Sequence, residues 1–456
     1  MINKMDRRTF LKAFMASQGA VASPSLLANA LSHSSALIDS SSFSDYKTLV
    51  CIFLRGGCDS LPLIVPNQFD SYNRYAMLRQ HLTYSQEDAV PLNPTNHDDL
   101  DVSFAGIGTD LASMFEDGLL SIVSNVGPLI EPVVKQSIED GAPKPKFLSS
   151  HSDQTSLWEA GSGFRGVTTG WGGRLYELLR SSNAVIPANI SITGINQFTQ
   201  GKESASYVID SLQPETLNSI GCGCGDTPYE NAYRLLSARG DSLFGAEYQR
   251  TLDSAIANNA LLAEAIANTE EIDTDYDYNT EEAGVFLADR LKVAARLIEV
   301  APAIGHKRQI IYIDMYDFDT HDRQIDRMPK LIGGLGKNIK AFIDELKLRG
   351  VDENAVIFTQ SEFGRTLTIN GDGTDHGWGG HQFIAGTPVK GGQIIGDLPR
   401  LELGTDDAWS NMIIPQFSIE QYGAQLARWM GVSQGYMTDL FGNFGSFDDI
   451  DMDLFR

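Results

Sequence analysis

Residues 309–322 read QIIYIDMYDFDTHD, an apolar run followed by four aspartates and a histidine. The apolar run is continuous rather than alternating, which is typical of a strand covered on both faces of a parallel sheet. Similar runs recur along the chain, separated by segments with helical spacing. This order predicts an α/β protein, a three-layer α/β/α sandwich with a mostly parallel sheet. Strands are expected at 48–54, 119–124, 186–193, 309–313, 355–359 and 382–385, and the clearest helices at 173–179, 285–300 and 328–348.

Polar residues collect where these predicted strands begin or end. RGGCDS follows the strand at 48–54, QSEFGRT follows the strand at 355–359, and GTDHGWGGH precedes the strand at 382–385. Ligands of open parallel sheets bind beyond the carboxyl ends of the strands. Carboxylates and imidazoles gathered there suit a divalent cation such as zinc or manganese. The pattern therefore indicates a metal site.

Each of these motifs also has a purely structural explanation. Asp59 is a common type of turn residue after two glycines, Glu362 is spaced to pair with Arg365, and Asp319 is suited to cap the next helix. Because such polar residues recur at the same end of successive predicted strands, a shared metal site is favoured over three unrelated structural roles. A further segment, SSHSDQ at 149–154, places His151 either in the same cleft or on the packed surface.

The N-terminus resembles a twin-arginine export signal. Arg7 and Arg8 precede Thr-Phe-Leu-Lys, a mildly apolar stretch follows, and Ala28-Asn29-Ala30 forms a small-x-small cleavage pattern. The apolar stretch is too interrupted for a comfortable membrane span. We expect a signal peptide at 1–30, a Ser-rich linker at 31–45 and a folded domain at 46–456, in a periplasmic or secreted protein that the twin-arginine machinery exports.

Composition excludes several classes of protein. With 35 Lys and Arg against 59 Asp and Glu, the formal net charge is −24, which argues against nucleic acid as a partner. Four cysteines in 456 residues exclude a disulfide scaffold. Cys51 is expected to be a buried thiol, and Cys222 and Cys224 form either a labile disulfide or two free thiols. RGGCDS does not supply the glycine spacing of a dinucleotide-binding loop.

The stretch at about 227–279 differs from the rest of the chain. It is rich in Ala, Glu and Asn at helical spacing and ends in an acidic segment. We interpret it as a helical insertion over the sheet, with an ordinary pair of crossover helices as the alternative.

Several segments resemble a large family of exported bacterial proteins, the DUF1501 domain of unknown function. They are RGGCDSLPLIVP, SSHSDQTSLWEAGSG, GWGGRLYELL, DFDTHDRQ, TQSEFGRT and TDHGWGGHQFIAGTPVKGGQIIG. The family is grouped with the alkaline phosphatase-like superfamily, which includes sulfatases. The resemblance implies an α/β/α sandwich that holds one or two divalent metals at the strand ends.

The resemblance also implies roles for individual residues. It assigns metal ligands to Asp59, to Asp319 or Asp317 with His321, to Glu362 and to His376, with His381 as a further ligand or a supporting group. Phe363 stands where relatives have histidine. The sulfatase nucleophile motif is absent. The catalytic candidates are therefore residues with no motif behind them: Ser60, Ser150, Thr320 and His151, with Arg365 or Arg55 as a clamp for anionic oxygens.

Two functional hypotheses follow. The first is an exported hydrolase that uses zinc, manganese or calcium and acts on a phosphate or sulfate ester, either a small anionic ester or a polysaccharide. The alternative is a non-catalytic exported surface or polysaccharide-binding protein that keeps the fold. Exposed faces of Trp158, Trp171 and Trp378 would favour the alternative, because aromatic faces stack on sugars, although core packing is the commoner fate of tryptophan.

Overall fold

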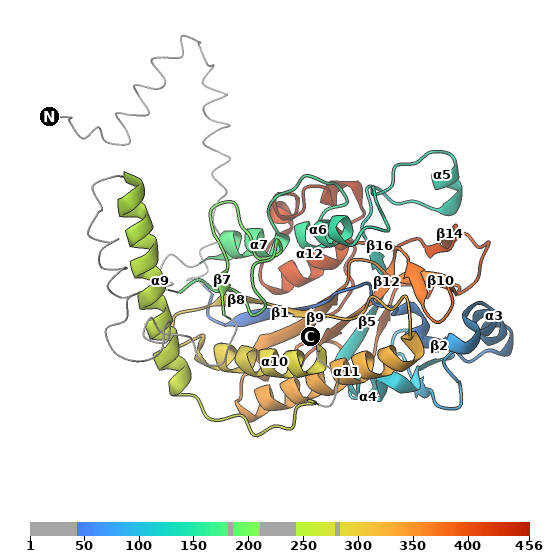
Figure 1. Ribbon diagram of the computed structural model, residues 1–456, viewed down its shortest axis with the longest axis horizontal. Helices are drawn as coiled ribbons and strands as arrows, with labels where there is room; N and C mark the ends of the chain where they lie inside the picture. Colours follow the sequence, from blue (N-terminus) through green and yellow to red (C-terminus); the bar gives the residue numbers. More distant parts are fainter. Residues whose placement is uncertain (1–42, 181–185, 210–242, 279–282) are drawn as a thin grey trace, which may run out of the picture. The chain divides into compact units, whose positions relative to one another are not determined.

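A central, mostly parallel sheet organises the computed structural model (Figure 1), which describes residues 43–180, 186–209, 243–278 and 283–456. Within these residues the sheet has nine strands in the order β13-β5-β12-β9-β1-β8-β6-β7, with β16 also paired to β5. The strands are β1 (Lys47–Leu54), β5 (Leu120–Gly127), β6 (Asn189–Ser191), β7 (Tyr207–Val208), β8 (Arg308–Met315), β9 (Ala355–Gln360), β12 (Gly380–Ala385), β13 (Ile394–Ile395) and β16 (Phe417–Ser418).

The direction of one strand decides where the polar segments meet. Strand β1 pairs in parallel with β8 and β9, whereas β12 runs antiparallel to its neighbours β5 and β9. Because β12 points the other way, the residues that precede it lie at the edge where β1, β8 and β9 end. The reversed strand thus brings the segment at 373–379 to the same edge as the loops that follow β1, β8 and β9.

Helices cover both faces of the sheet and form the two outer layers (Figure 1). On one face lie α4 (Thr109–Glu116), α10 (Ala283–Val300) and α11 (Gln324–Leu348), which pack against one another. On the other face lie α6 (His151–Ala160), α7 (Trp171–Leu179) and α12 (Ile419–Trp429). The predicted α/β/α sandwich with a mostly parallel sheet is confirmed.

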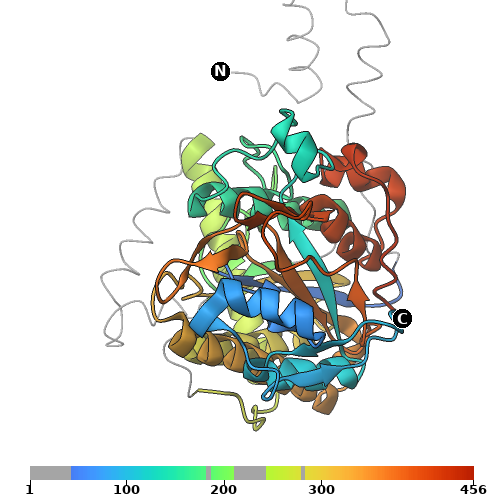
Figure 2. The same ribbon diagram turned by 90° about the vertical axis from the view of Figure 1, so that its right-hand side faces the viewer.

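Smaller elements surround these layers. Helix α3 and the small sheet β2-β4-β3 lie together at one end of the described unit, facing the viewer in blue and cyan in Figure 2. The remaining helices and strands are β2 (Ile64–Pro66), α3 (Phe69–Arg79), β3 (Val90–Leu92), β4 (Val102–Phe104), α5 (Lys135–Glu139), α9 (Leu243–Ala267), β10 (Arg365–Ile369), β11 (Thr374–His376), β14 (Ala408–Trp409), β15 (Met412–Ile413) and α13 (Met437–Leu440).

The predicted strands and helices correspond closely to observed elements. Each of the six predicted strands overlaps one strand of the central sheet, and the three predicted helices overlap α7, α10 and α11. Cys51 is fully buried in β1, as expected. Burial on both faces explains the continuous apolar runs, since all eight residues of β8 and all six of β9 are buried.

The three tryptophans that could have faced a sugar are core residues instead. Trp158 and Trp171 are fully buried and Trp378 is 1% exposed. The ring of Trp171 packs edge-on against Phe198 with the centroids 4.8 Å apart. Stacking of these tryptophans on a polysaccharide is therefore incompatible with the structure.

Several expectations lie outside the described residues. They are the signal peptide at 1–30, nearly all of the linker at 31–45, and the pair Cys222 and Cys224. Of the expected insertion the structure describes 243–278, where α9 packs against α10 and the backbone N–H of Asp277 donates to Asn338 Oδ1 of α11 at 2.8 Å. No helix in the described ranges is both long and apolar enough to cross a membrane.

A buried carboxyl group at the start of α12 predicts a specific pH dependence of stability. Glu420 is fully buried, and burial raises its pKa from 4.5 to about 7. The folded protein therefore keeps a proton that the unfolded chain releases near pH 4.5. The protonated carboxyl stabilises the folded state fully below pH 4.5. This contribution to the free energy of unfolding, roughly 3 kcal/mol in total, is lost as the pH rises to about 7.

Replacement of Glu420 by glutamine is expected to remove that loss. Glutamine stays neutral and keeps an oxygen that can accept from the backbone N–H of Gly163, which lies 3.2 Å from Glu420 Oε1. Relative to the wild type, Glu420→Gln should gain stability in urea unfolding between pH 5 and pH 8. The exposed control Glu353→Gln should show no such gain. An equal difference between Glu420→Gln and wild type at both pH values would contradict the assignment.

Candidate metal centre

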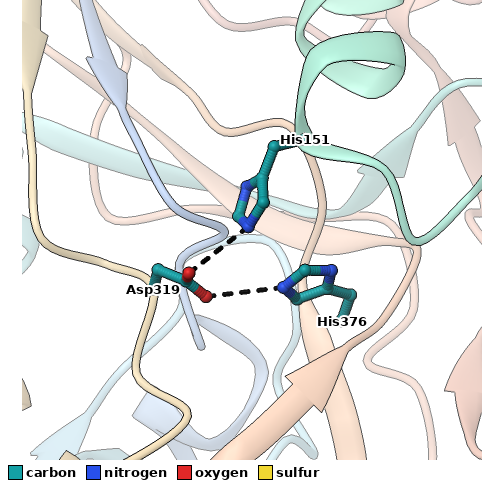
Figure 3. A group of neighbouring side chains, drawn as sticks. All are labelled: His151, Asp319 and His376. Atoms are coloured by element: carbon teal, nitrogen blue, oxygen red, sulfur yellow. Dashed lines mark ion pairs between the residues drawn. The ribbon is translucent and has the colours of Figure 1, made fainter.

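Three side chains from distant parts of the sequence meet at the edge where the parallel strands end (Figure 3). Asp319 follows β8, His151 is the first residue of α6, and His376 is the last residue of β11. One ligand atom from each lies within 4.8 Å of the other two. We call these residues the His-Asp-His cluster.

The spacing of the ligand atoms suits a shared cation. His151 Nε2 lies 3.5 Å from Asp319 Oδ2, and His376 Nε2 lies 3.4 Å from Asp319 Oδ1. Two ligand atoms bound at the usual 2.0–2.1 Å to a tetrahedral zinc ion are roughly 3.3 Å apart. Two imidazoles and one carboxylate also form a typical zinc donor set that leaves a fourth position open. The cluster therefore fits a divalent cation in both distance and chemistry.

The outer nitrogens of both histidines are held by hydrogen-bond partners. His376 Nδ1 faces the Ser149 carbonyl oxygen at 2.7 Å, so this nitrogen carries the proton and Nε2 keeps its lone pair. His151 Nδ1 lies 2.9 Å from Glu362 Oε1. A histidine that binds a metal usually donates its other N–H to a carbonyl or a carboxylate in this way. Both rings are thus oriented with Nε2 toward Asp319.

The local electrostatics favour the metal-binding charge states of His376 and Asp319, whereas at His151 they favour the protonated form, which a metal would have to displace. The hydrogen bond to Glu362 raises the pKa of His151 despite partial burial. Burial lowers the pKa of His376, which keeps that imidazole neutral. Burial opposes the charge on Asp319, but the guanidinium of Arg365 outweighs it and holds the pKa of Asp319 below its usual value. A neutral imidazole and an ionised carboxylate are the forms that bind metals.

Glu362 acts through His151 in this arrangement. Its Oε1 atom accepts from the Gly56 backbone N–H at 2.8 Å and faces His151 Nδ1, and its side chain is almost fully buried. The sequence-based expectation made Glu362 a metal ligand. In the structure it lies behind one member of the cluster and orients that ring.

His321 lies beside the cluster, as its place in the Asp-Thr-His motif predicted. His321 Nε2 is 3.2 Å from Asp319 Oδ1 and 2.8 Å from His376 Nε2. Its Nδ1 atom lies 3.5 Å from Asp375 Oδ1. The structure thus brings together Asp319, His321 and His376 from the expected set and adds His151.

Two other expected ligands have different partners. Asp59 is fully buried, and both of its carboxylate oxygens accept from Arg79, one of them at 3.0 Å. Gln324 also donates to Asp59. His381 lies in β12, where its Nδ1 atom accepts from the Asn125 backbone N–H at 3.2 Å, and burial lowers its pKa to about 3. Contrary to expectation, the structure brings neither Asp59 nor His381 to the cluster.

Two of the three expected nucleophilic hydroxyl groups are inaccessible. Ser60 is 1% exposed and Thr320 is fully buried. Thr320 Oγ1 donates to Gln324 Oε1 at 3.2 Å. Ser150 instead caps α6, with its Oγ atom accepting from the Asp153 backbone N–H. Burial thus keeps Ser60 and Thr320 away from a substrate, and the hydrogen bonds of Thr320 and Ser150 give their hydroxyl groups structural roles.

The two arginines considered as anion clamps are already engaged. Arg365 is fully buried and donates to Asp319 Oδ1 at 2.7 Å and to the backbone carbonyls of Gly56, Gly57, Phe318 and Thr374. Arg55 donates to Asp314 and Glu159, each at 2.7 Å. Arg365 therefore positions Asp319 and the surrounding loops rather than receiving an anion.

The glycines after β1 let the loops approach closely. Gly56 has φ +117°, and a Cβ atom there would lie 2.2 Å from the backbone nitrogen of Asp319. Gly57 has φ +86°, and its Cβ would lie 2.3 Å from the ring of Phe363. Only glycine fits both the backbone conformation and the space. The motif RGG thus places the loop after β1 directly against Asp319 and Glu362.

Sequence reasoning ranked His151 below the other histidines, although one local signal was available. Ser150 followed by Asp153 predicts a helix N-terminus at His151, and α6 begins there. That signal gives the start of the helix. It does not reveal that α6 points His151 at a loop 168 positions later in the chain.

Solved structures with a detectable likeness to this chain include enzymes of several kinds. The lipoteichoic acid synthase LtaP from Listeria monocytogenes is 9% identical with a TM-score of 0.26, and the match covers 74% of this chain and 64% of the synthase. The PsFucS1 sulfatase from Pseudoalteromonas sp. is 11% identical with a TM-score of 0.30, and the match covers 86% and 68%. Nothing about substrate or reaction carries over at such identities.

The sequence itself gives the family. No curated protein sequence shows a significant match. The family model described as "Protein of unknown function (DUF1501)" matches residues 46–421, which is most of the chain and includes every member of the cluster. The chain therefore belongs to the DUF1501 family.

Proposed function

We propose that this protein is an exported, metal-dependent hydrolase of a phosphate or sulfate ester. The observation that carries the proposal is the convergence of His151, Asp319 and His376 at the strand ends, with ligand-atom spacings that match a shared cation. A structural ion pair would need no second imidazole at the same carboxylate. Nor would it need both outer ring nitrogens to be fixed by other groups.

The donor set favours zinc over calcium. Calcium takes six to eight oxygen ligands, whereas this cluster offers two nitrogens and one carboxylate. His151, Asp319 and His376 would hold the ion, with His321 beside them. A divalent cation there supplies positive charge that stabilises a transferring phosphoryl or sulfuryl group. Glu362 would keep His151 in place, and Arg365 would do the same for Asp319. The cation would also give a chain of −24 net charge a local positive centre that attracts an anionic substrate.

Export is part of the same proposal. The twin-arginine pattern at Arg7 and Arg8 would direct the protein to the periplasm or the exterior, after it has folded and loaded its metal. The substrate would then be a small anionic ester or an ester group on a polysaccharide outside the cytoplasm.

The alternative, a non-catalytic surface or polysaccharide-binding protein, loses its strongest support. It relied on exposed tryptophans, and Trp158, Trp171 and Trp378 are all buried. One observation remains compatible with this alternative: Phe363 stands where relatives have histidine. Its ring stacks on His376 with the centroids 4.5 Å apart and supplies no metal ligand.

The test measures metal content and ester hydrolysis of the purified protein on aryl phosphates, aryl sulfates and sulfated sugars. We expect one equivalent of zinc and turnover on at least one ester. Variant His376→Ala should lower kcat/KM by roughly a hundredfold or more, because it removes a ligand of the cation. The exposed histidine His81 gives the matched control His81→Ala, which should change neither value. Zinc at unit stoichiometry without turnover on any ester would remove the enzyme proposal and leave the alternative.

A further inference from the structure

The loop that leads into α6 is positively charged in a strongly acidic protein. Residues 141–152, GAPKPKFLSSHS, contain Lys144, Lys146 and His151 between the carboxylates of Asp140 and Asp153, although acids outnumber bases by 59 to 35 in the whole chain. Lys146 is exposed and forms no ion pair within the described ranges. The Nζ atom of Lys144 lies over the ring of Trp409, 4.7 Å from its centroid. Lys146 thus presents a positive charge to solvent five residues before His151.

An exposed aromatic ring lies beside these lysines. Phe147 is 58% exposed and has φ +57°, a conformation that is strained for a bulky residue. The buried amide of Gln154 holds it there by donating to the carbonyl oxygens of Lys146 and Phe147 at 3.1 and 3.0 Å. The guanidinium of Arg165 lies 4.8 Å from the ring centroid and pairs with Asp153 Oδ1 at 2.7 Å. The fold therefore holds Phe147 in a strained backbone conformation with its ring largely exposed, although burial of the ring does not compensate for the strain.

The loop contacts the cluster directly. The Ser149 carbonyl oxygen, two residues after Phe147, accepts from His376 Nδ1, and His151 itself begins the next helix. Figure 1 shows this segment running back from the projecting helix α5 to the start of α6. Lys146 and Phe147 therefore lie five and four residues before one histidine of the cluster, on the segment whose backbone holds the other.

We propose that Lys146 and Phe147 form a subsite that binds an anionic oligosaccharide next to the cluster. The flat C–H face of a pyranose would pack on the Phe147 ring, and Lys146 would pair with a further sulfate or phosphate group on the same sugar chain. The inference deepens the proposed function and rests on it, since it extends the same site. A membrane surface would require a broader set of apolar residues than one ring flanked by lysine and serines.

The test is direct binding by calorimetry, with no hydrolysis involved. The probe is a sulfated glucose oligomer, compared with the unsulfated oligomer of the same length, on metal-loaded and on chelator-treated protein. We expect the wild type to bind the sulfated oligomer about tenfold or more tightly than the unsulfated one. Lys146→Gln and Phe147→Leu should each weaken binding by about fivefold. Lys146→Arg should retain it.

Controls and outcomes separate this inference from the proposed hydrolase. Lys340→Gln, at a partly exposed position on α11, should bind as the wild type does, and all variants should melt at the same temperature as the wild type. Wild-type binding by both Lys146→Gln and Phe147→Leu would overturn the subsite, even if esters are hydrolysed. Binding that depends on these residues would support it even if no ester is turned over. Lys146-dependent binding to phosphatidylglycerol vesicles without oligomer binding would also overturn it.

Discussion

Replacement of Asp319 by asparagine is expected to weaken zinc binding by roughly a hundredfold or more. Asp319 offers one oxygen to His376 and the other to His151, so it is the residue that joins the cluster. Asparagine has the same shape and keeps an oxygen that can accept from Arg365, but it removes the negative charge that balances the cation. The measurement is a competition titration of metal-free protein against a chromophoric zinc chelator.

A neighbouring carboxylate provides the control for this substitution. Asp322 is exposed, lies three residues away and pairs with Arg327 at 3.5 Å. Asp322→Asn removes the same charge near the site, but it should leave zinc affinity within about twofold of wild type, since solvent screens exposed charges. If Asp319→Asn and Asp322→Asn bind zinc equally well, the cluster is not the metal site.

Replacement of Arg79 by methionine is expected to destabilise the protein by about 3–5 kcal/mol. Arg79 and Asp59 form a doubly hydrogen-bonded ion pair with both side chains almost completely buried. Loss of the guanidinium leaves a buried carboxylate without its counter-charge. The free energy of unfolding in urea, measured at neutral pH, gives the size of the effect.

A double-mutant cycle identifies the cause. Adding Asp59→Asn to Arg79→Met removes the orphaned charge and should recover much of the lost stability, whereas independent sites would give additive losses. Asp59→Asn alone should leave zinc affinity unchanged, because its oxygens face Arg79 and Gln324. A loss of zinc binding in Asp59→Asn as large as that in Asp319→Asn would restore Asp59 as a ligand and contradict the structural role.

The layers of the fold could be predicted because burial leaves a direct trace in the sequence. Strands covered on both faces, such as β8 and β9, must be apolar at every position, and this pattern differs from that of the helices between them. The direction of β12 left no such trace. Its six residues are buried in an antiparallel setting just as they would be in a parallel one.

The candidate site was only partly predictable for a related reason. Asp319 and His376 could be selected because they lie where predicted strands end or begin. Asp59 has the same sequence context, and what distinguishes it is Arg79, twenty residues later, which takes up both of its oxygens. His381 lies inside β12, so its side chain enters the core between strands. Sequence gives residue types at strand ends, whereas the partner of each carboxylate is decided by tertiary packing.

The most direct test of the metal centre is anomalous diffraction from crystals of the zinc-loaded protein, with data collected on both sides of the zinc absorption edge. The account predicts one strong anomalous peak at about 2.0–2.2 Å from His151 Nε2, His376 Nε2 and a carboxylate oxygen of Asp319. A zinc peak only at other positions, with none among these three side chains at saturating zinc, would contradict it.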